Sequence, residues 1–331
     1  MKSYRSIHYV LFYLILGMPL SVLAQDYQPP RTAAGHPDLQ GNWSNASITT
    51  LERNPRYAGL ILSSDEVARA TTEHPQNVRL ATDDNQVQGE LGDGDDLARG
   101  RGYNAFWIEP GTRFGRINGE YRTSWIIDPA DGQIPFSEEG RQRLAALDAR
   151  NASKAGPDAL PLADRCISTA MRVGPPMING LYNNYYQIVQ TPDYVVVRTE
   201  MVSHARIIPI DKSHSMEVQA PLFGESVGYW EGDTLVVETT NFSPLQEETD
   251  IPLSHLASVT ERFTRVSQDQ IVYEFTVSDP RYYKQVWRGE ESFLAVEEGV
   301  YEFACHEGNY AMKGILAGAR VQEREARQAN P

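Results

Sequence analysis

The second half of the chain alternates short apolar segments with tight turns, and this pattern restricts the fold more than any other feature. Segments such as Tyr185–Gln190, Tyr194–Met201 and Leu235–Thr240 alternate apolar and polar residues, as strands with one buried face do. Turn sequences rich in Asp, Gly, Pro and Ser separate them, for example Glu231–Asp233. About nine such strands joined by short turns predict an antiparallel meander.

A meander of this length has to hide its two edge strands, and closure into a barrel achieves this. We therefore expect a mainly β, barrel-like (lipocalin-like) domain with an N-terminal extension and a few helices. The other predicted strands span residues 122–127, 206–210, 227–230, 259–266, 271–277, 282–287 and 300–304. Predicted helices span residues 64–73, 137–150 and 310–327. Ser63 precedes the first and Ser137 begins the second, and both serines are suited to cap a helix.

The first 24 residues have the features of a cleavable export signal. Lys2 and Arg5 precede an uncharged apolar run over residues 9–20, and the small residue Ala24 stands where a signal peptidase cuts. A membrane anchor would need about 20 apolar residues, and Pro19 and Ser21 cut this run short. We expect a periplasmic or secreted protein with no membrane span after cleavage, an extended segment over 25–104 with one helix and a polar loop, and a β-rich main domain over 105–331.

The negative net charge of the chain disfavours some classes of binding partner. The chain has 44 Asp and Glu against 30 Lys and Arg, a net charge of −14, and removal of residues 1–24 takes away two further positive charges. A field of this sign repels phosphate backbones and anionic lipid surfaces. We therefore expect no nucleic-acid partner, and a small molecule or saccharide as the ligand. The oligomeric state does not follow from the sequence.

Two cysteines, Cys166 and Cys305, are the only ones in the chain. In an oxidising compartment such a pair most simply forms one disulfide, and the alternative is two free thiols or a nucleophilic cysteine. A bond would bring the segments around both cysteines together. The segment that follows Cys305 combines His306, Glu307, Asn309 and Tyr310.

This polar segment offers a general base in His306, its carboxylate partner in Glu307, and hydrogen-bond donors in Asn309 and Tyr310. The alternative is a disulfide-anchored turn in which Asn309 caps the last helix. The loop with Asn183, Asn184 and Tyr185 would then lie nearby, supplying amide and phenol groups that recognise sugar hydroxyls or carboxylates. An ordinary turn that leads into a strand is the alternative for this loop.

Alternation along residues 194–201 places Arg198 and Glu200 on one strand face, and His204 joins them if the register continues. This row either faces solvent or lines a polar lumen, where Arg198 would hold Glu200 ionised while His204 exchanges protons. If the protein is an enzyme, Arg206 or Arg198 would bind a carboxylate of the substrate. His204 and His306 could also ligate a metal with a glutamate, but no spacing typical of a metal site supports this.

Tyr229 and Trp230 form a stacking surface or belong to the core. The sequence lacks the phosphate-binding, dinucleotide-binding, zinc-protease and serine-hydrolase motifs that can be recognised from spacing. We expect no metal and no cofactor.

Several segments together resemble an uncharacterised family of secreted bacterial proteins. The segments are residues 35–43, 51–53, 122–135, 165–168, 183–192, 228–242 and 301–310, the last being Tyr-Glu-Phe-Ala-Cys-His-Glu-Gly-Asn-Tyr. The resemblance covers essentially the whole mature chain. The resemblance implies export and a single fold, but it does not imply any particular reaction or substrate.

Three functions follow as hypotheses. The first is an extracytoplasmic enzyme, a lyase, isomerase or hydrolase, that uses acid/base chemistry on a small polar or glycan-derived molecule. Its catalytic residues would be His306, Glu307, His204 and Glu200. The second is a non-catalytic, lipocalin-like binding protein for an apolar or aromatic ligand. A structural envelope component without a pocket is a third.

Overall fold

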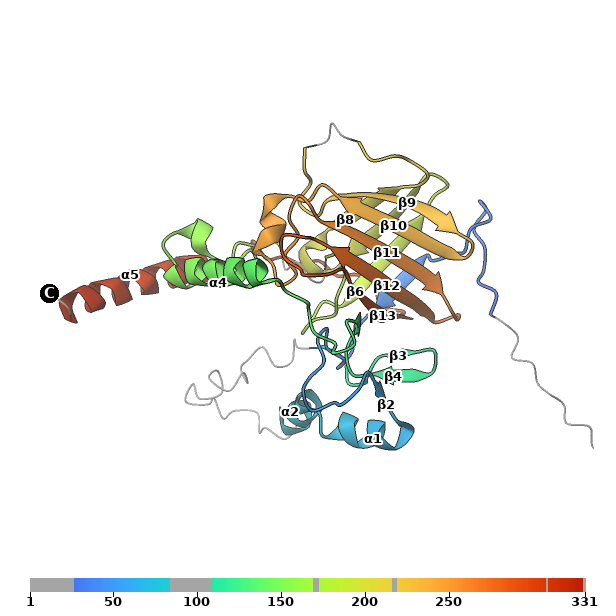
Figure 1. Ribbon diagram of the computed structural model, residues 1–331, viewed down its shortest axis with the longest axis horizontal. Coiled ribbons are helices and arrows are strands. Elements are labelled where there is room, and N and C mark those ends of the chain that lie inside the picture. The colour runs from blue at the N-terminus through green and yellow to red at the C-terminus, as the bar shows by residue number, and fades with distance from the viewer. Residues whose placement is uncertain (1–26, 84–108, 169–172, 216–218, 308, 330–331) are drawn as a thin grey trace, which may run out of the picture.

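The computed structural model describes residues 27–83, 109–168, 173–215, 219–307 and 309–329. Nine antiparallel strands form one nearly closed, barrel-shaped sheet, and a few helices lie outside it, as the sequence predicts (Figure 1). The strands follow the order β8-β7-β6-β1-β13-β12-β11-β10-β9, and β5 adds to β13. The predicted signal peptide and most of the predicted polar loop lie outside the described residues.

Most strands of the barrel come from the second half of the chain. They are β6 (Tyr185–Gln190), β7 (Tyr194–Thr199), β8 (Ala205–Pro209), β9 (Glu225–Glu231), β10 (Thr234–Thr240), β11 (Ser258–Arg265), β12 (Gln270–Ser278) and β13 (Trp287–Ala295). Short one-turn helices interrupt the connections at Pro157–Ala159, Met201–Ser203 and Pro244–Glu248. The predicted strands at 282–287 and 300–304 are wrong. Strand β13 begins only at Trp287, and residues 300–304 belong to no strand.

The N-terminal part contributes to the barrel. Strand β1 (Gly41–Ser44) pairs with β6 and β13, and Trp43 is buried in the core. A second, three-stranded sheet joins β2 (Ile61–Leu62), β4 (Glu120–Arg122) and β3 (Arg116–Ile117), while β5 (Ile126–Asp128) joins the barrel. Both sheets therefore contain strands from either side of the expected boundary at residues 104 and 105.

The helices begin at local capping signals. Helix α1 (Ser64–Thr72) has the capping box formed by Ser63 and Glu66, and α2 (Pro75–Asp83) follows it below the barrel in Figure 1. Ser137 caps α4 (Glu138–Ser153). Helix α5 (Ala311–Ala329) projects beside α4, and Arg320 donates to the carbonyls at the end of α4. No helix of the described residues is long and apolar enough to cross a membrane.

Aromatic side chains fill the interior of the barrel. Tyr186 and Phe293 stack with ring centroids 4.9 Å apart, Tyr273 contacts Phe293 at 5.3 Å, and Phe275 meets Trp287 edge to face at 5.6 Å. All of these side chains are buried. The centre of the barrel is therefore a packed core, in contrast to the open cavity of a ligand-carrying lipocalin-like barrel.

Candidate functional site

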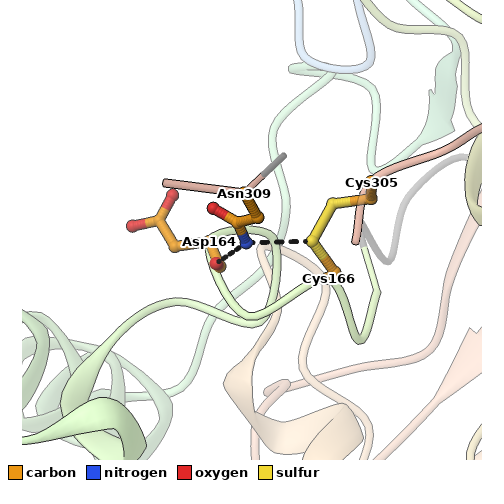
Figure 2. Close-up of a disulfide and its surroundings, with 4 residues drawn as sticks. All are labelled: Asp164, Cys166, Cys305 and Asn309. Atoms are coloured by element: carbon orange, nitrogen blue, oxygen red, sulfur yellow. Dashed lines mark hydrogen bonds between the residues drawn. A yellow bond between two sulfur atoms is a disulfide. The ribbon is translucent and has the colours of Figure 1, made fainter. Parts of the chain in front are cut away.

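The disulfide between Cys166 and Cys305 is present, as predicted (Figure 2). Asn309 holds the turn beside it, because its side-chain amide donates to Asp164 O and to Cys166 Sγ, each at 3.2 Å. His306 and Glu307 are exposed, and among the described residues their side chains make no hydrogen bond or ion pair. The structure thus places this proposed base and its partner in solvent, as it does Tyr310, which is 80% exposed.

Glu200 links the two loops that the disulfide was expected to bring together. Its carboxylate accepts from the Asn183 amide at 2.5 Å and from the backbone N–H of Tyr301 at 3.3 Å. It is buried, and its backbone is helical because β7 has ended at Thr199. The alternation therefore breaks, and Arg198, on the outer face of β7, shares no face with Glu200 and His204.

Asn184 and Tyr185 also hold the loop in place. The fully buried Asn184 side chain bonds both backbone groups of Gly180 and the carbonyl of Glu109. The Tyr185 hydroxyl donates to the Glu109 carboxylate at 3.1 Å. Burial and this neighbouring negative charge raise the pKa of Tyr185 to about 12. These side chains have partners within the protein, so they are less available to a ligand.

Tyr229 and Trp230 project from opposite faces of β9, as consecutive strand residues do. The Tyr229 hydroxyl donates to Glu238 on the neighbouring strand, at 3.1 Å. The Trp230 ring packs against the core and is covered by His36, with ring centroids 4.9 Å apart and planes nearly parallel. The two rings therefore form no common stacking surface.

A cleft lies between the two strands that end the sheet, β8 and β9. Among the described residues, one parallel bridge, Ile210 to Gly228, joins the chain at these edges. Beside the bridge a cleft of about 320 Å³ opens. We call it the seam cleft, and its walls include His204, Ala205, Arg206, Ile207, Phe223 and Ser226. Two of the residues proposed from the sequence, His204 and Arg206, therefore meet in one cleft.

His204 is a neutral imidazole at neutral pH. Its ring packs on Phe223 with centroids 4.3 Å apart. Burial, followed by the positive charge of Arg206, lowers the pKa of His204 to about 4. Phe223 also contacts a small apolar cluster that includes Phe303, two residues before the disulfide. The C-terminal segment therefore supports the wall on which His204 rests.

Arg206 points into the barrel and pairs with Glu261. Its Nη1 donates to Glu261 Oε1 at 2.9 Å and its Nη2 to the second oxygen, so the pair is bidentate. Both side chains are almost fully buried. Burial opposes the charge of Arg206, but the attraction of Glu261 outweighs it and keeps the Arg206 pKa raised. Among the described residues, no acceptor pairs with the buried Nε–H of Arg206.

Hydrogen bonds extend this ion pair on both sides. The hydroxyl of Tyr273 donates to Glu261 at 2.8 Å and accepts from Met177 N at 2.9 Å. Burial and the Glu261 charge raise the pKa of Tyr273 well above its ordinary value. On the cleft side, Ser226 accepts from Arg206 at 3.3 Å and bonds to the hydroxyl of Thr239 at 2.8 Å.

Glu261 and Tyr273 are not among the site residues expected from the sequence. The sequence nevertheless contains a pattern that could have identified Glu261 as a buried residue. Val259, Glu261 and Phe263 occupy every second position of β11, and all three side chains point inward. A charged residue in an otherwise apolar row is expensive to bury unless it is paired, and so marks a buried partner. Its partner could not be identified, since the register between distant strands is not encoded locally.

The described residues contain no group of three or more His, Cys, Asp or Glu side chains placed to hold a metal ion. Comparison with known proteins gave no matching family model, no matching curated protein and no matching solved structure. The resemblance to a family of secreted proteins therefore stays a prediction, and function has to be inferred from the cleft itself.

Proposed function

We propose that this chain is an exported protein that binds a small, uncharged organic molecule in the seam cleft. The observation that carries the proposal is the cleft itself, in which the neutral His204 and the neutralised Arg206–Glu261 pair lie beside the apolar side chains of Ile207 and Phe223. A concave site with apolar walls and a few polar groups is typical of small-molecule binding.

The cleft suits an uncharged ligand better than the carboxylate expected from the sequence. Glu261 already neutralises Arg206, and His204 is neutral. The walls are largely apolar, with Ile207, Leu222 and Phe223 among them. A molecule with an apolar body and one carbonyl or hydroxyl acceptor matches these groups. The net charge of the chain, −14, further disfavours anions.

Export is part of the proposal and has two supports. Residues 1–24 have the composition of a signal peptide. The Cys166–Cys305 disulfide suits an oxidising compartment such as the periplasm.

Ligand-observed NMR with a defined set of uncharged fragments (amides, lactones and aromatic alcohols) tests the proposal. The variant Ala205→Trp fills the cleft from an exposed wall position, and Val189→Trp, on the outer face of β6, is the matched control. We expect fragments to bind the wild type and Val189→Trp, and to bind Ala205→Trp roughly tenfold more weakly or less. Equal binding to both variants, or no binding to the wild type, would overturn the proposal.

The second candidate is an acid/base enzyme, a lyase, isomerase or hydrolase, that works in the same cleft. The neutral imidazole of His204, which shares the cleft with a guanidinium, favours it. A base of this pKa is deprotonated but weak at neutral pH, which is why we place binding first.

Turnover of a metabolite mixture by the wild type, His204→Ala and His306→Ala separates the candidates. An enzyme that uses His204 would show constant kcat/KM from pH 7 to about 5 and lose activity as the pH falls through about 4. Activity would be lost in His204→Ala and kept in His306→Ala, which lies in solvent. Identical product profiles for all three proteins would exclude a catalytic role for either histidine.

A further inference from the structure

The free edge of β8 directs backbone groups into the seam cleft. Thr199 N donates to His204 O at 2.8 Å, so His204 and the other even-numbered residues of β8 direct their backbone groups toward β7. In an antiparallel ladder the residues between them direct theirs to the opposite side. The N–H and C=O groups of Ala205 and Ile207 therefore face the cleft, and both residues line it.

The edge of β9 faces the same cleft. Gly228 O accepts from Asp211 N at 2.8 Å, so Gly228 faces β8. Ser226, two residues earlier on the strand, has the same orientation and lines the cleft. Pro209, the next residue of β8 to face the cleft, has no N–H to pair. Within the described parts of the chain, the cleft is thus bounded by two strand edges whose outward backbone groups belong to no strand ladder, and the bridge at Gly228 lies beside it.

We propose, resting on the proposed function, that the ligand of the seam cleft is a short extended peptide whose backbone pairs with the edge of β8. Unpaired backbone groups on a strand edge recognise a second extended chain through main-chain hydrogen bonds. Ala205 and Ile207 supply two N–H and two C=O groups on one side, and Ser226 supplies one of each on the other. The cleft volume of about 320 Å³ limits the bound segment to a few residues.

The outer side chains of such a peptide extend an existing apolar row. Val189 pairs with Val196, and Val196 pairs with Ile207, across strands β6, β7 and β8. Ile207 is 64% exposed at the end of this row. Cross-strand neighbours that are both β-branched stabilise a sheet, so a valine or isoleucine beside Ile207 is favoured.

The inner side chain of the peptide lies on the same side of the strand as Arg206. Glu261 already balances the Arg206 charge, and the Ser226 hydroxyl lies beside Arg206 at the cleft. A hydroxyl or amide suits this polar, neutral surface, and a carboxylate would add an uncompensated negative charge near a buried pair. Alternation along a strand therefore predicts a peptide with β-branched apolar residues outward and a polar, uncharged residue inward.

The probe is an N-acetylated, C-amidated tripeptide of valine, threonine and valine, titrated into the ¹⁵N-labelled mature protein. We expect the amide resonances of Ala205, Ile207 and Ser226 to shift and the exchange of these amide hydrogens to slow. The same tripeptide methylated at every backbone nitrogen keeps the side chains but loses the donors. It should bind roughly tenfold more weakly or less, the loss expected for about one net hydrogen bond.

Two results would overturn peptide recognition, and they differ from failure of the proposed function. Equal affinity of the methylated and unmethylated tripeptides, or shifts confined to residues outside the cleft, would exclude backbone pairing. Uncharged fragments that bind in the cleft while the tripeptide does not would leave small-molecule binding in place and remove the peptide. If neither the fragments nor the tripeptide bind, both proposals fall.

Discussion

At the scale of single residues, the barrel buries ionisable groups at inward positions of its strands, and each is tied to a specific partner. Arg206 and Glu261 neutralise each other, while Glu291 on β13 has no cation beside it among the described residues. Burial raises the pKa of Glu291 well above its usual range, which favours the protonated, uncharged carboxyl. Its Oε1 accepts from Asn179 N at 3.0 Å.

The Glu261→Gln substitution should lower the free energy of unfolding by about 3–5 kcal/mol, because it leaves the Arg206 charge buried without a partner. The double variant Arg206→Met, Glu261→Gln removes both charges and keeps an acceptor for Tyr273. It should regain most of the loss. Urea unfolding measures both proteins, and a double variant no more stable than Glu261→Gln would contradict this view of the pair.

The Glu291→Gln substitution should stabilise the protein increasingly as the pH rises. Folded Glu291 keeps its proton above the pH at which the unfolded carboxyl loses it, so Glu291 disfavours folding progressively as the pH rises above about 4.5. Glutamine stays neutral and can still accept from Asn179 N. Unfolding free energies of variant and wild type should therefore diverge as the pH rises above about 4.5.

The neighbouring Glu290 is the matched control for this comparison. It accepts from Arg122 Nε at 2.5 Å on the other face of β13. Glu290→Gln should therefore lower stability at neutral pH. A gain for Glu290→Gln, or a loss for Glu291→Gln at pH 8, would contradict the assignment of charged and neutral states.

At the scale of elements, the sequence predicted those whose signals are local. Ser63 with Glu66 and the serine at 137 mark two helix starts, and apolar segments between turn sequences located β6 to β12. Strand β13 was missed because Arg288, Gly289 and Glu290 conceal its alternation. In the folded strand Gly289 leaves room for the ring of Phe275, which a Cβ atom would approach to 2.2 Å.

The C-terminal element depends on the disulfide more than on its own packing. Ala319 is the one buried residue of α5, and Tyr301 N and Phe303 N bond the preceding segment to Glu200 and Ser203. The disulfide closes a loop with a sequence separation of 139 residues. Closing a loop of this length limits the entropy of the unfolded chain.

The double variant Cys166→Ser, Cys305→Ser should therefore lose about 3–5 kcal/mol of unfolding free energy. Trypsin should also cleave at Lys313 and Arg320 earlier than in the wild type, because the segment before α5 is then held by few contacts. Mass spectrometry of timed digests measures this order. Identical digestion of oxidised wild type and variant would show that the disulfide does not hold α5.

At the scale of the whole molecule, the defining feature is a barrel that almost closes. The sequence predicted the barrel and named His204 and Arg206, but Phe223, Ser226 and Glu261 joined them only through the register of strands far apart in the chain. The same reasoning placed His306 and Glu307 in a site because they are polar neighbours in sequence. Their exposure shows that adjacency in sequence is a weaker guide than an inward position on a strand.

Residue-resolved amide hydrogen exchange along β8 in the free protein tests the open seam most directly. The amides of Arg206 and Ile208 pair with β7 and should exchange slowly. Those of Ala205 and Ile207 face the cleft and should exchange as fast as amides of exposed loops. Equal, strong protection at all four positions would mean that β8 and β9 are joined along their length, and the seam cleft would then not exist as a binding site.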